Sequence, residues 1–148
     1  MNKSHLTAIT RRALSLPTRY LKQAGLLVGL MLDYGCGRGF DCDELGCDGY
    51  DPYWRDSFTD SIYDTIFCNY VLNVLPDEDQ RNDTLGHIQR LLVDGGKAYI
   101  TVRNDKFVDG HTSKGTWQGH VRLELPIVKI CSGFVMYCLD KDAVLRSK

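Results

Sequence analysis

The chain has 148 residues, of which 43% are hydrophobic and 25% are charged, and its formal net charge is −1. This length and composition are typical of one globular domain, so we expect a single domain over residues 1–148. No apolar run approaches the roughly 20 residues of a membrane span. The longest run, Leu26–Leu32, leads directly into Asp33. We therefore expect a cytoplasmic protein with no membrane segment and no signal peptide.

Positive charge is concentrated at the start of the chain. No acidic residue precedes Asp33, and the segment before it carries Lys3, Arg11, Arg12, Arg19 and Lys22. We divide the domain into a basic, helical N-terminal segment (residues 1–29) and a core (residues 30–148). A basic segment can contact phosphates, so nucleic acid is a candidate partner, and a solvated helix face is the alternative.

The six cysteines raise the question of a disulfide framework or a metal site. They contain no C-x-x-C pair, and none has a histidine at zinc-finger spacing. We therefore predict reduced structural thiols and no metal. The cysteines are Cys36, Cys42, Cys47, Cys68, Cys131 and Cys138.

The first elements of the chain are a helix and a strand. Ser15 and Pro17 mark a helix start, because serine is a favoured cap and proline suits the first turn, and Gly25 ends this helix. A buried strand over Leu30–Tyr34 then leads into a glycine-rich turn.

The remaining elements alternate between helix and strand. We predict a short helix over Asp41–Leu45, a strand ending at Asp51, a strand over 63–68, a helix over Asp77–Val93, a strand over 97–103 and a last strand over 133–139. The last strand is expected to be antiparallel at the sheet edge. This alternation predicts an α/β fold with a mostly parallel sheet.

Three glycines follow the first strand within five positions, in the stretch LDYGCGRGFD at residues 32–41. Gly35 permits a tight turn, and Gly37 and Gly39 let a ligand approach the backbone. Asp51, after the next strand, can accept hydrogen bonds from both hydroxyls of a ribose. A strand, a glycine turn, a helix start and then such an acid predict a nucleotide site.

The identity of this nucleotide follows from the residues around the glycines. Phe40 stands where the dinucleotide fingerprint needs a small residue, and no G-K-[ST] of a P-loop is present. Asp33 would repel a pyrophosphate but tolerates a cationic ligand. S-adenosylmethionine (SAM) has a sulfonium, a free amino group and an adenosine ribose. We predict that Gly35 to Gly39 cradle SAM, with Asp33 beneath its amino-acid end.

The same stretch, LDYGCGRG, resembles the first motif of class I SAM-dependent methyltransferases, an acid followed by G-x-G-x-G. GYDPY at residues 49–53 resembles their ribose-binding segment. Residues 63–102, which begin YDTIFCNYVLNVL, resemble their fourth strand, the following helix and the turn into the fifth strand.

This resemblance implies a compact Rossmann-like fold and transfer of a methyl group from SAM to an acceptor, with S-adenosylhomocysteine (SAH) as the product. It also implies cofactor-binding roles for a set of ten residues. They are Asp33, Tyr34, Gly35, Cys36, Gly37, Gly39, Asp51, Pro52, Asn69 and Tyr70.

A narrower resemblance involves the start of the chain. TAITRRALSLP at residues 7–17, together with the motifs above, is similar to methyltransferases associated with DNA phosphorothioation gene clusters. TSKGTWQ at residues 112–118 resembles a T-x-x-G-T-F-Q segment of the same group, with Trp117 in place of phenylalanine.

The sequence departs from the class I pattern in two places. The stretch between Asp51 and Asp64 is too short for a helix, a third strand and a further helix, a region that usually supplies the acid contacting adenine. Asp60 is the candidate for that acid, and a solvated loop carboxylate is the alternative. Residues 104–148 are short for the two-strand hairpin that commonly ends this fold. These departures keep open an alternative, a SAM-binding sensor or accessory subunit that lacks transferase activity and contacts nucleic acid.

The sequence assigns no catalytic residue. Methyl transfer is an in-line displacement, in which alignment of the nucleophile supplies much of the catalysis. His87 is expected on the surface of its helix, whereas His111 and His120 flank a polar stretch on the expected substrate side. Tyr53 and Trp54 either cover the adenine ring or pack against a helix.

Overall fold

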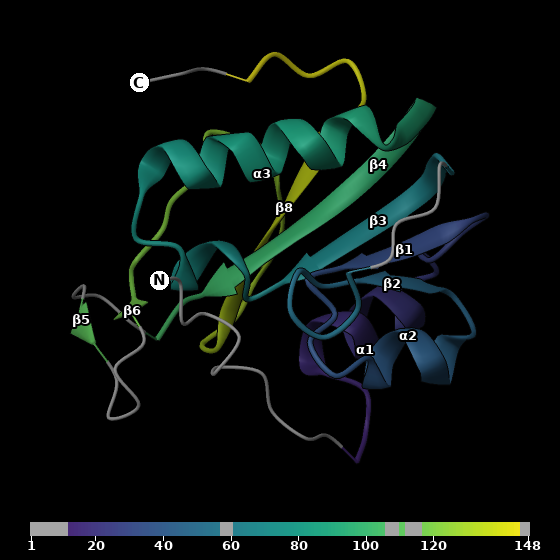
Figure 1. Cartoon of the computed structure of the whole chain (residues 1–148), viewed down its shortest axis with the longest axis horizontal. Helices are drawn as coiled ribbons and strands as arrows, with labels where there is room; N and C mark the ends of the chain where they lie inside the picture. Colours follow the sequence, from purple (N-terminus) through teal and green to yellow (C-terminus); the bar gives the residue numbers. More distant parts are fainter. Residues whose placement is uncertain (1–11, 57–60, 106–109, 112–116, 146–148) are drawn as a thin grey trace.

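A sheet of six strands, in the order β2-β1-β3-β4-β8-β7, forms the centre of the fold (Figure 1). The computed structural model describes residues 12–56, 61–105, 110–111 and 117–145. The strands of the sheet are β1 (Met31–Tyr34), β2 (Asp48–Tyr50), β3 (Tyr63–Asn69), β4 (Leu92–Arg103), β7 (Ile127–Ile130) and β8 (Phe134–Asp140). The short strands β5 (Gly110–His111) and β6 (Trp117–Gln118) pair with each other.

The sheet is parallel from β2 to β4, and β8 and β7 add an antiparallel pair. The chain runs from β1 outward to β2 and then returns to the opposite side of β1 for β3. The carboxyl ends of β1 and β3 therefore meet where the strand order reverses, which is where open α/β sheets bind ligands. The prediction of a mostly parallel α/β sheet is confirmed.

Helices cover both faces of the sheet (Figure 1). On one face, Leu85 and Ile88 of α3 (Glu78–Arg90) share a buried cluster with Ile66. On the other face, Leu21 of α1 (Leu16–Gln23) clusters with Phe67, and α2 (Phe40–Leu45) lies beside it. Adjacent residues of β3 thus enter opposite cores, as the period of two in a strand requires.

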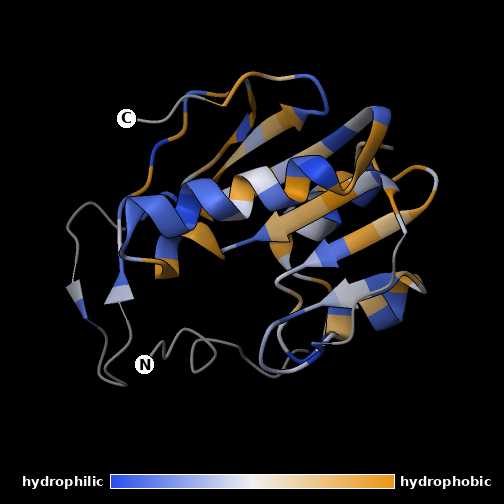
Figure 2. Cartoon of the chain, turned by 45° about the horizontal axis from the view of Figure 1, so that its top comes forward, coloured by the Kyte–Doolittle hydropathy of each residue, from blue (hydrophilic) through white to orange (hydrophobic). Residues whose placement is uncertain are grey.

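The hydropathy of the elements agrees with this layering. In Figure 2 the outward side of α3 is hydrophilic, whereas the central strands are largely hydrophobic. Full burial of one leucine or isoleucine side chain contributes roughly 1.5–3 kcal/mol. The two clusters therefore hold the helices against the sheet.

The elements from Ser15 to Asn69 match the prediction closely. Helix α1 follows Ser15, has Pro17 in its first turn, and is followed by Gly25 at φ +71°. The bounds of β1, α2, β2 and β3 lie within one residue of those predicted from the pattern. Local sequence signals were sufficient in this half of the chain.

The predicted end of the helix over Asp77–Val93 was wrong. The helix begins after Asp77, whose carboxylate accepts a hydrogen bond from the N–H of Asp79 (2.9 Å), but it ends at Arg90. The carbonyl of Leu91 instead accepts from the N–H of Tyr63 (2.7 Å), and β4 begins at Leu92. Leu92 and Val93, the last apolar residues of the helical pattern, therefore belong to β4, which pairs with β3.

The predicted antiparallel edge of the sheet is confirmed, but the edge is a strand that the sequence pattern did not predict. Strand β8 is antiparallel to β4, as predicted, but β7 lies outside it and forms the edge of the sheet. The segment after residue 104 therefore does contain a two-strand hairpin. Ile127 and Ile130 are 54% and 57% exposed. Strand β7 therefore lacks the alternation of buried apolar and exposed polar residues from which a strand can be predicted.

The region between β2 and β3 is reduced. Within residues 51–56 and 61–62 the structure has no helix or strand, only a bridge between Asp51 and Arg55. Asp60 lies outside the described residues. Strand β2 consequently forms the second edge of the sheet.

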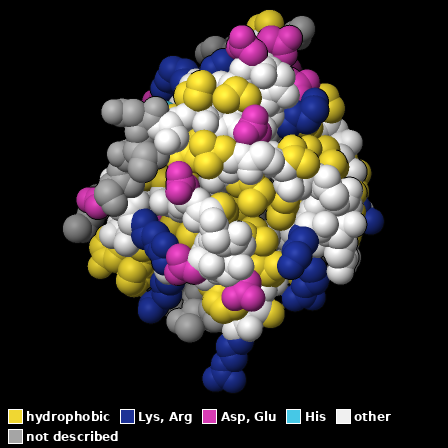
Figure 3. Space-filling model, turned by 90° about the vertical axis from the view of Figure 1, so that its right-hand side faces the viewer, with side chains coloured by type: hydrophobic (Ala, Val, Ile, Leu, Met, Phe, Trp, Pro, Cys, Tyr) yellow, Lys and Arg dark blue, Asp and Glu magenta, His cyan; other side chains and the backbone are white. Residues whose placement is uncertain are grey.

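The face at the right of Figure 1 carries the amino-terminal ends of the parallel strands. Figure 3 shows hydrophobic side chains there among acidic and basic ones. Val28, Leu30 and Ile62, which precede β1 and β3, are about half exposed, at 57%, 49% and 52%.

No helix in the described part of the chain combines the length and apolarity that a membrane crossing requires.

We expect Gly35→Ala to lower the free energy of unfolding more than Gly46→Ala does. Both glycines are left-handed, at φ +80° and +67°, where a side chain costs about 1–2 kcal/mol. At Gly35 the added Cβ would also overlap Cγ2 of Val71, whereas nothing lies within 4 Å at Gly46. Urea unfolding followed by circular dichroism measures both losses. Equal losses would contradict the close packing of the loop against Val71.

Candidate functional site

The glycine turn is held against the end of β2. The N–H groups of Gly35 and Cys36 both donate to the carbonyl of Tyr50, at 2.7 and 2.9 Å. Gly35, Gly37 and Gly39 have φ values of +80°, +56° and +90°, which other residues rarely adopt. The glycines thus allow the backbone to turn its amides toward β2.

Asp51 links this loop to the turn that follows β2. Its Oδ2 accepts from the N–H of Gly37 (2.9 Å), and its Oδ1 accepts from the N–H groups of Tyr53 (2.9 Å) and Trp54 (3.0 Å). A carboxylate has about four acceptor positions. Three are filled here, so Asp51 keeps room for one hydroxyl of a ligand without breaking a backbone bond.

Arg55 closes the same turn over the loop. Its guanidinium pairs with Asp43 at 2.6 Å and donates to the carbonyl of Arg38 at 3.2 Å. A Cβ on Gly39 would overlap this guanidinium, so the glycine is needed for the close approach. The hydrogen bond from Arg55 also lowers the pKa of the Asp43 carboxyl.

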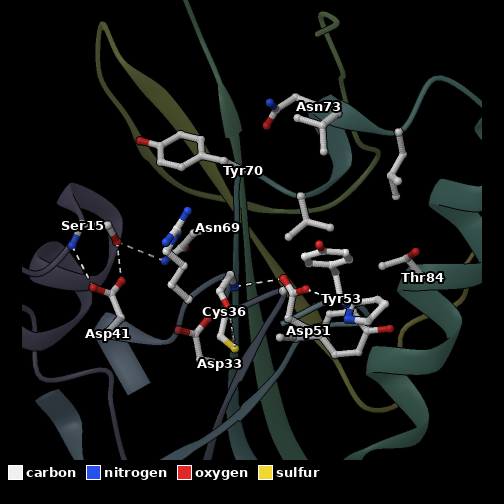
Figure 4. Close-up of a pocket in the computed structure, with 18 of the residues that line it drawn as sticks. Ser15, Asp33, Cys36, Asp41, Asp51, Tyr53, Asn69, Tyr70, Asn73 and Thr84 are labelled. Carbon is white, nitrogen blue, oxygen red and sulfur yellow. Dashed lines mark hydrogen bonds between the residues drawn. The ribbon is translucent and has the colours of Figure 1, made fainter. Parts of the chain in front are cut away.

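All ten residues predicted to bind the cofactor line one cavity of about 910 Å³ at the carboxyl ends of β1 and β3. Figure 4 shows Ser15 and Asp41 on one side of it, Asp51 and Tyr53 on the other, and Tyr70 and Asn73 above. Ligand cavities commonly measure about 300–1,000 Å³. The structure thus gathers these residues, and their role as cofactor contacts stays a prediction.

Two residues at the base of the cavity differ in charge. Asp33, at the end of β1, is only 4% exposed. Beside it, a hydrogen bond with Cys42, together with burial, raises the pKa of the Cys36 thiol. The thiol therefore stays neutral beside Asp33.

A buried network that the sequence did not predict joins α1, α2 and β3. The Oδ2 of Asp41 accepts from the hydroxyls of Ser15 (2.6 Å) and Thr18 (2.7 Å), and its Oδ1 accepts from the N–H of Ser15 (3.1 Å). Thr18 in turn accepts from Nδ2 of Asn69 (2.8 Å). Ser15 therefore caps α1 by sequence position, but its hydroxyl bonds across the fold to Asp41.

Two further carboxamides line the cavity, and neither was singled out as a site residue from the sequence. Asn73 lies in the 3-10 helix η2 (Leu72–Val74), and its Nδ2 donates to Oε1 of Gln118 in β6 (2.8 Å). Asn73 is 1% exposed and Gln118 is 9% exposed. The only sequence signal for Gln118 was its place in the TSKGTWQ segment.

The backbone is strained where β3 ends. Tyr70 has φ +61°, the one positive φ of a residue other than glycine among the described residues. Its N–H donates to the carbonyl of Thr101 (2.8 Å) and holds this conformation. Such strain costs about 1–3 kcal/mol and is found most often at functional sites. The strained residue here lies between Asn69, at the end of β3, and the turn that carries Asn73.

His87, expected on the surface of its helix, is only partly exposed and contacts the sheet. Its Nδ1 is 2.7 Å from the hydroxyl of Tyr34, a buried residue of the glycine-loop motif. Burial raises the pKa of the Tyr34 hydroxyl and lowers the pKa of His87. The pair thus connects α3 to β1 in its neutral form.

The other two histidines and the aromatic pair are more exposed. His111 and His120 do not line the cavity; Nε of Arg122 lies 3.0 Å from Nε2 of His120. Tyr53 lines the cavity and is 59% exposed, and the Arg38 guanidinium lies 4.5 Å from the Trp54 ring centroid. Of the two aromatics, Tyr53 is therefore the one available to a ligand.

Comparisons with known proteins agree with this geometry. A family model described as "Methyltransferase domain" matches residues 7–128. No curated protein sequence matches significantly.

Solved structures share the fold at low sequence identity. The structure of DhpI in complex with SAH has a TM-score of 0.59 at 15% identity and covers 82% of this chain and 81% of that one. PH0226 from Pyrococcus horikoshii OT3 gives 0.54 at 13%, with 83% and 86% covered. A TehB-like SAM-dependent methyltransferase from Corynebacterium glutamicum gives 0.53 at 19%, with 84% and 87% covered. The predicted Rossmann-like fold is therefore confirmed.

We expect Asp41→Ala to lower the free energy of unfolding by about 3 kcal/mol, because it leaves buried hydroxyls without their acceptor. The matched control is Asp43→Ala in the same helix, whose side chain is 63% exposed, and we expect a much smaller loss there. Urea titration measures both values. Similar losses for the two variants would show that the buried network does not stabilise the fold.

The stability of the protein should also depend on His87 as the pH falls. Because the pKa of His87 is lowered in the folded state from 6.5, protons favour the unfolded chain below that pH. The contribution is fully present above pH 6.5 and is lost as the pH falls toward the folded pKa. His87→Gln keeps an acceptor for Tyr34 without titrating, so its unfolding free energy should fall less between about pH 7 and 5. A slope identical to that of the wild type would exclude this role.

Proposed function

The chain belongs to the methyltransferase domain family, and we propose that it transfers a methyl group from SAM to an acceptor, releasing SAH. One observation carries the proposal. The ten residues named from the sequence come from three separate segments, residues 33–39, 51–52 and 69–70, yet they line a single cavity where the strand order of the sheet reverses.

The residues of this cavity fit the cofactor. The left-handed glycines keep the loop close to Val71 and Arg55, whose side chains a Cβ at Gly35 or Gly39 would overlap, and so hold the loop at the edge of the cavity. Asp51 has an acceptor position for a ribose hydroxyl, and buried Asp33 suits a cationic amino group. Tyr53, exposed at the rim, is placed to cover the adenine ring.

In this proposal the protein acts mainly by position. SAM supplies an electrophilic methyl group on a sulfonium centre. Asp33 and Asp51 hold the two ends of the cofactor, and the edge of the cavity formed by Asn69 and Tyr70 receives the acceptor. Alignment of the acceptor with the methyl group then supplies much of the rate.

Nucleic acid is the macromolecular partner that we propose on sequence grounds. The narrower resemblance to methyltransferases associated with DNA phosphorothioation gene clusters supports it. Arg12, Arg19 and Lys22, the basic residues of the N-terminal segment that the structure describes, are exposed and available for phosphates.

Calorimetry with SAM tests the proposed function. We expect wild-type protein to bind SAM, and Asp51→Asn to bind it roughly 10- to 100-fold more weakly, the value of a hydrogen bond to a charged group. Asparagine keeps one acceptor oxygen, enough for the N–H groups of Tyr53 and Trp54 or for that of Gly37 but not for both sides. Circular dichroism must therefore show that the variant is folded before its affinity is compared.

The control for this experiment is Asp94→Ala. Asp94 is an exposed carboxylate at the opposite end of β4 from the cavity, and its removal should leave SAM affinity unchanged. Absence of SAM binding, or affinity indifferent to Asp51, would refute the proposed function.

A further inference from the structure

We propose that the methyl acceptor is an amine, held through its N–H groups by the side-chain oxygens of Asn69 and Asn73. This inference rests on the proposed function and names the substrate class of the same site. Three buried side-chain polar atoms in the described part of the chain have no hydrogen-bond partner. Two of them, Asn69 Oδ1 and Asn73 Oδ1, belong to residues that line the cavity.

The orientation of Asn69 follows from the network beneath it. The hydroxyls of Ser15 and Thr18 give their protons to Asp41, at 2.6 and 2.7 Å. Their oxygens can then only accept, so Asn69 must present its Nδ2 to them, at 3.4 and 2.8 Å. The carbonyl oxygen of Asn69 is therefore left without a partner by the chemistry of its neighbours.

Asn73 is fixed in a similar way. Its Nδ2 donates to Gln118 Oε1 (2.8 Å), and its backbone carbonyl accepts from the N–H of Gly119 (2.8 Å). Reversing the amide of Asn73 alone would place two carbonyl oxygens together. Its Oδ1 is thus an acceptor in a residue that is 1% exposed.

Both oxygens call for hydrogen-bond donors. A buried acceptor without a partner costs about 1–3 kcal/mol, and a ligand that brings N–H or O–H groups removes this cost. Nδ2 of Asn69 donates to Ser15 and Thr18, and Nδ2 of Asn73 donates to Gln118, so the protein itself already uses most of the N–H groups of these two side chains. A substrate that offers only acceptors, such as a carboxylate, finds no complement at these two side chains.

Oxygen and nitrogen nucleophiles place different demands on the cavity. A hydroxyl nucleophile needs a base to take its proton during attack. No histidine or lysine is among the described residues that line the cavity, so an aspartate would have to take that role. A neutral amine can donate N–H groups to the asparagines and still keep its lone pair for the methyl carbon.

The transfer step balances without an added reactant. The nitrogen lone pair forms the new N–C bond while the C–S bond breaks and its electrons pass to sulfur. The positive charge moves from sulfur to nitrogen, and the resulting ammonium releases one proton to water.

Charge around the cavity supports a cationic product. Its described lining has two arginines, Arg38 and Arg103, against five aspartates, a formal charge of −3. The aspartates are Asp33, Asp41, Asp51, Asp83 and Asp105. Arg103 is itself paired with Asp105 at 2.8 Å. An anionic acceptor would be repelled, and a positive charge developing on nitrogen would be stabilised.

Four small probes with the same ring test the proposal: benzylamine, benzyl alcohol, benzyl mercaptan and benzoate. Their binding to SAH-saturated protein is measured by ligand-observed NMR, after calorimetry has confirmed that SAH binds. Failure of SAH to bind would count against the proposed function, whereas the ranking of the probes tests this inference. We expect benzylamine to bind at least tenfold more tightly than the alcohol or the thiol, and benzoate not to bind.

Variants distinguish the contribution of Asn73 to benzylamine binding from that of the net charge of the cavity. Asn73→Leu should weaken benzylamine at least tenfold and leave SAH affinity within twofold. Gln118→Met, which removes the partner that orients Asn73, should act in the same direction and serves if Asn73→Leu fails to fold. Gln80→Ala, at an exposed position on α3 that lines the same cavity, is the control and should have no effect.

The overturning results are equally definite. The amine assignment would be refuted if benzyl alcohol or benzoate bound as tightly as benzylamine, or if benzylamine did not bind. It would also be refuted if a folded Asn73→Leu or Gln118→Met variant bound benzylamine with unchanged affinity.

Discussion

Three backbone N–H groups hold the glycine loop against the end of β2, and the rest of the cavity is arranged around this contact. Gly35 and Cys36 donate to the carbonyl of Tyr50, and Gly37 donates to the carboxylate of Asp51. Because β1 and β2 are parallel neighbours, the loop after one strand and the acid after the other emerge side by side. The three bonds then set the separation between the loop and Asp51, so the protein itself fixes the geometry of this part of the cavity.

The reduced region after β2 makes Arg55 important. Without a helix in described residues 51–56, the turn has little apolar surface to bury, and polar bonds take that role. Arg55 binds Asp43 in α2 and the carbonyl of Arg38 in the loop, and it packs over Gly39. An ion pair this exposed stabilises little by itself. Its effect here is geometric, because it ties the turn that presents Asp51 to the helix that follows the glycines.

The sequence predicted the parts of the structure that depend on neighbours along the chain. The strand, glycine turn, short helix and acid over residues 31–51 follow from local backbone preferences, and they were placed within one residue. The network of Ser15, Asp41 and Asn69 joins residues 26 and 54 positions apart, for which periodicity gives no signal. Leu91 was misplaced for the same reason: its apolar side chain suits a helix or a strand, and a long-range bond from Tyr63 decides between them.

The two sides of the cavity therefore differ in how they are encoded. The proposed cofactor side is one continuous stretch plus an acid after the next strand, so a motif describes it. The proposed acceptor side is made by side chains from η2, β6 and the end of β3, brought together only by the fold. Asp41 belongs to both sides. It closes the stretch that begins with the glycines, and it takes the protons of Ser15 and Thr18 that would otherwise be free to donate to Asn69. The residue that ends the recognisable motif thus sets, through two hydroxyls, which atom of Asn69 is left for the acceptor.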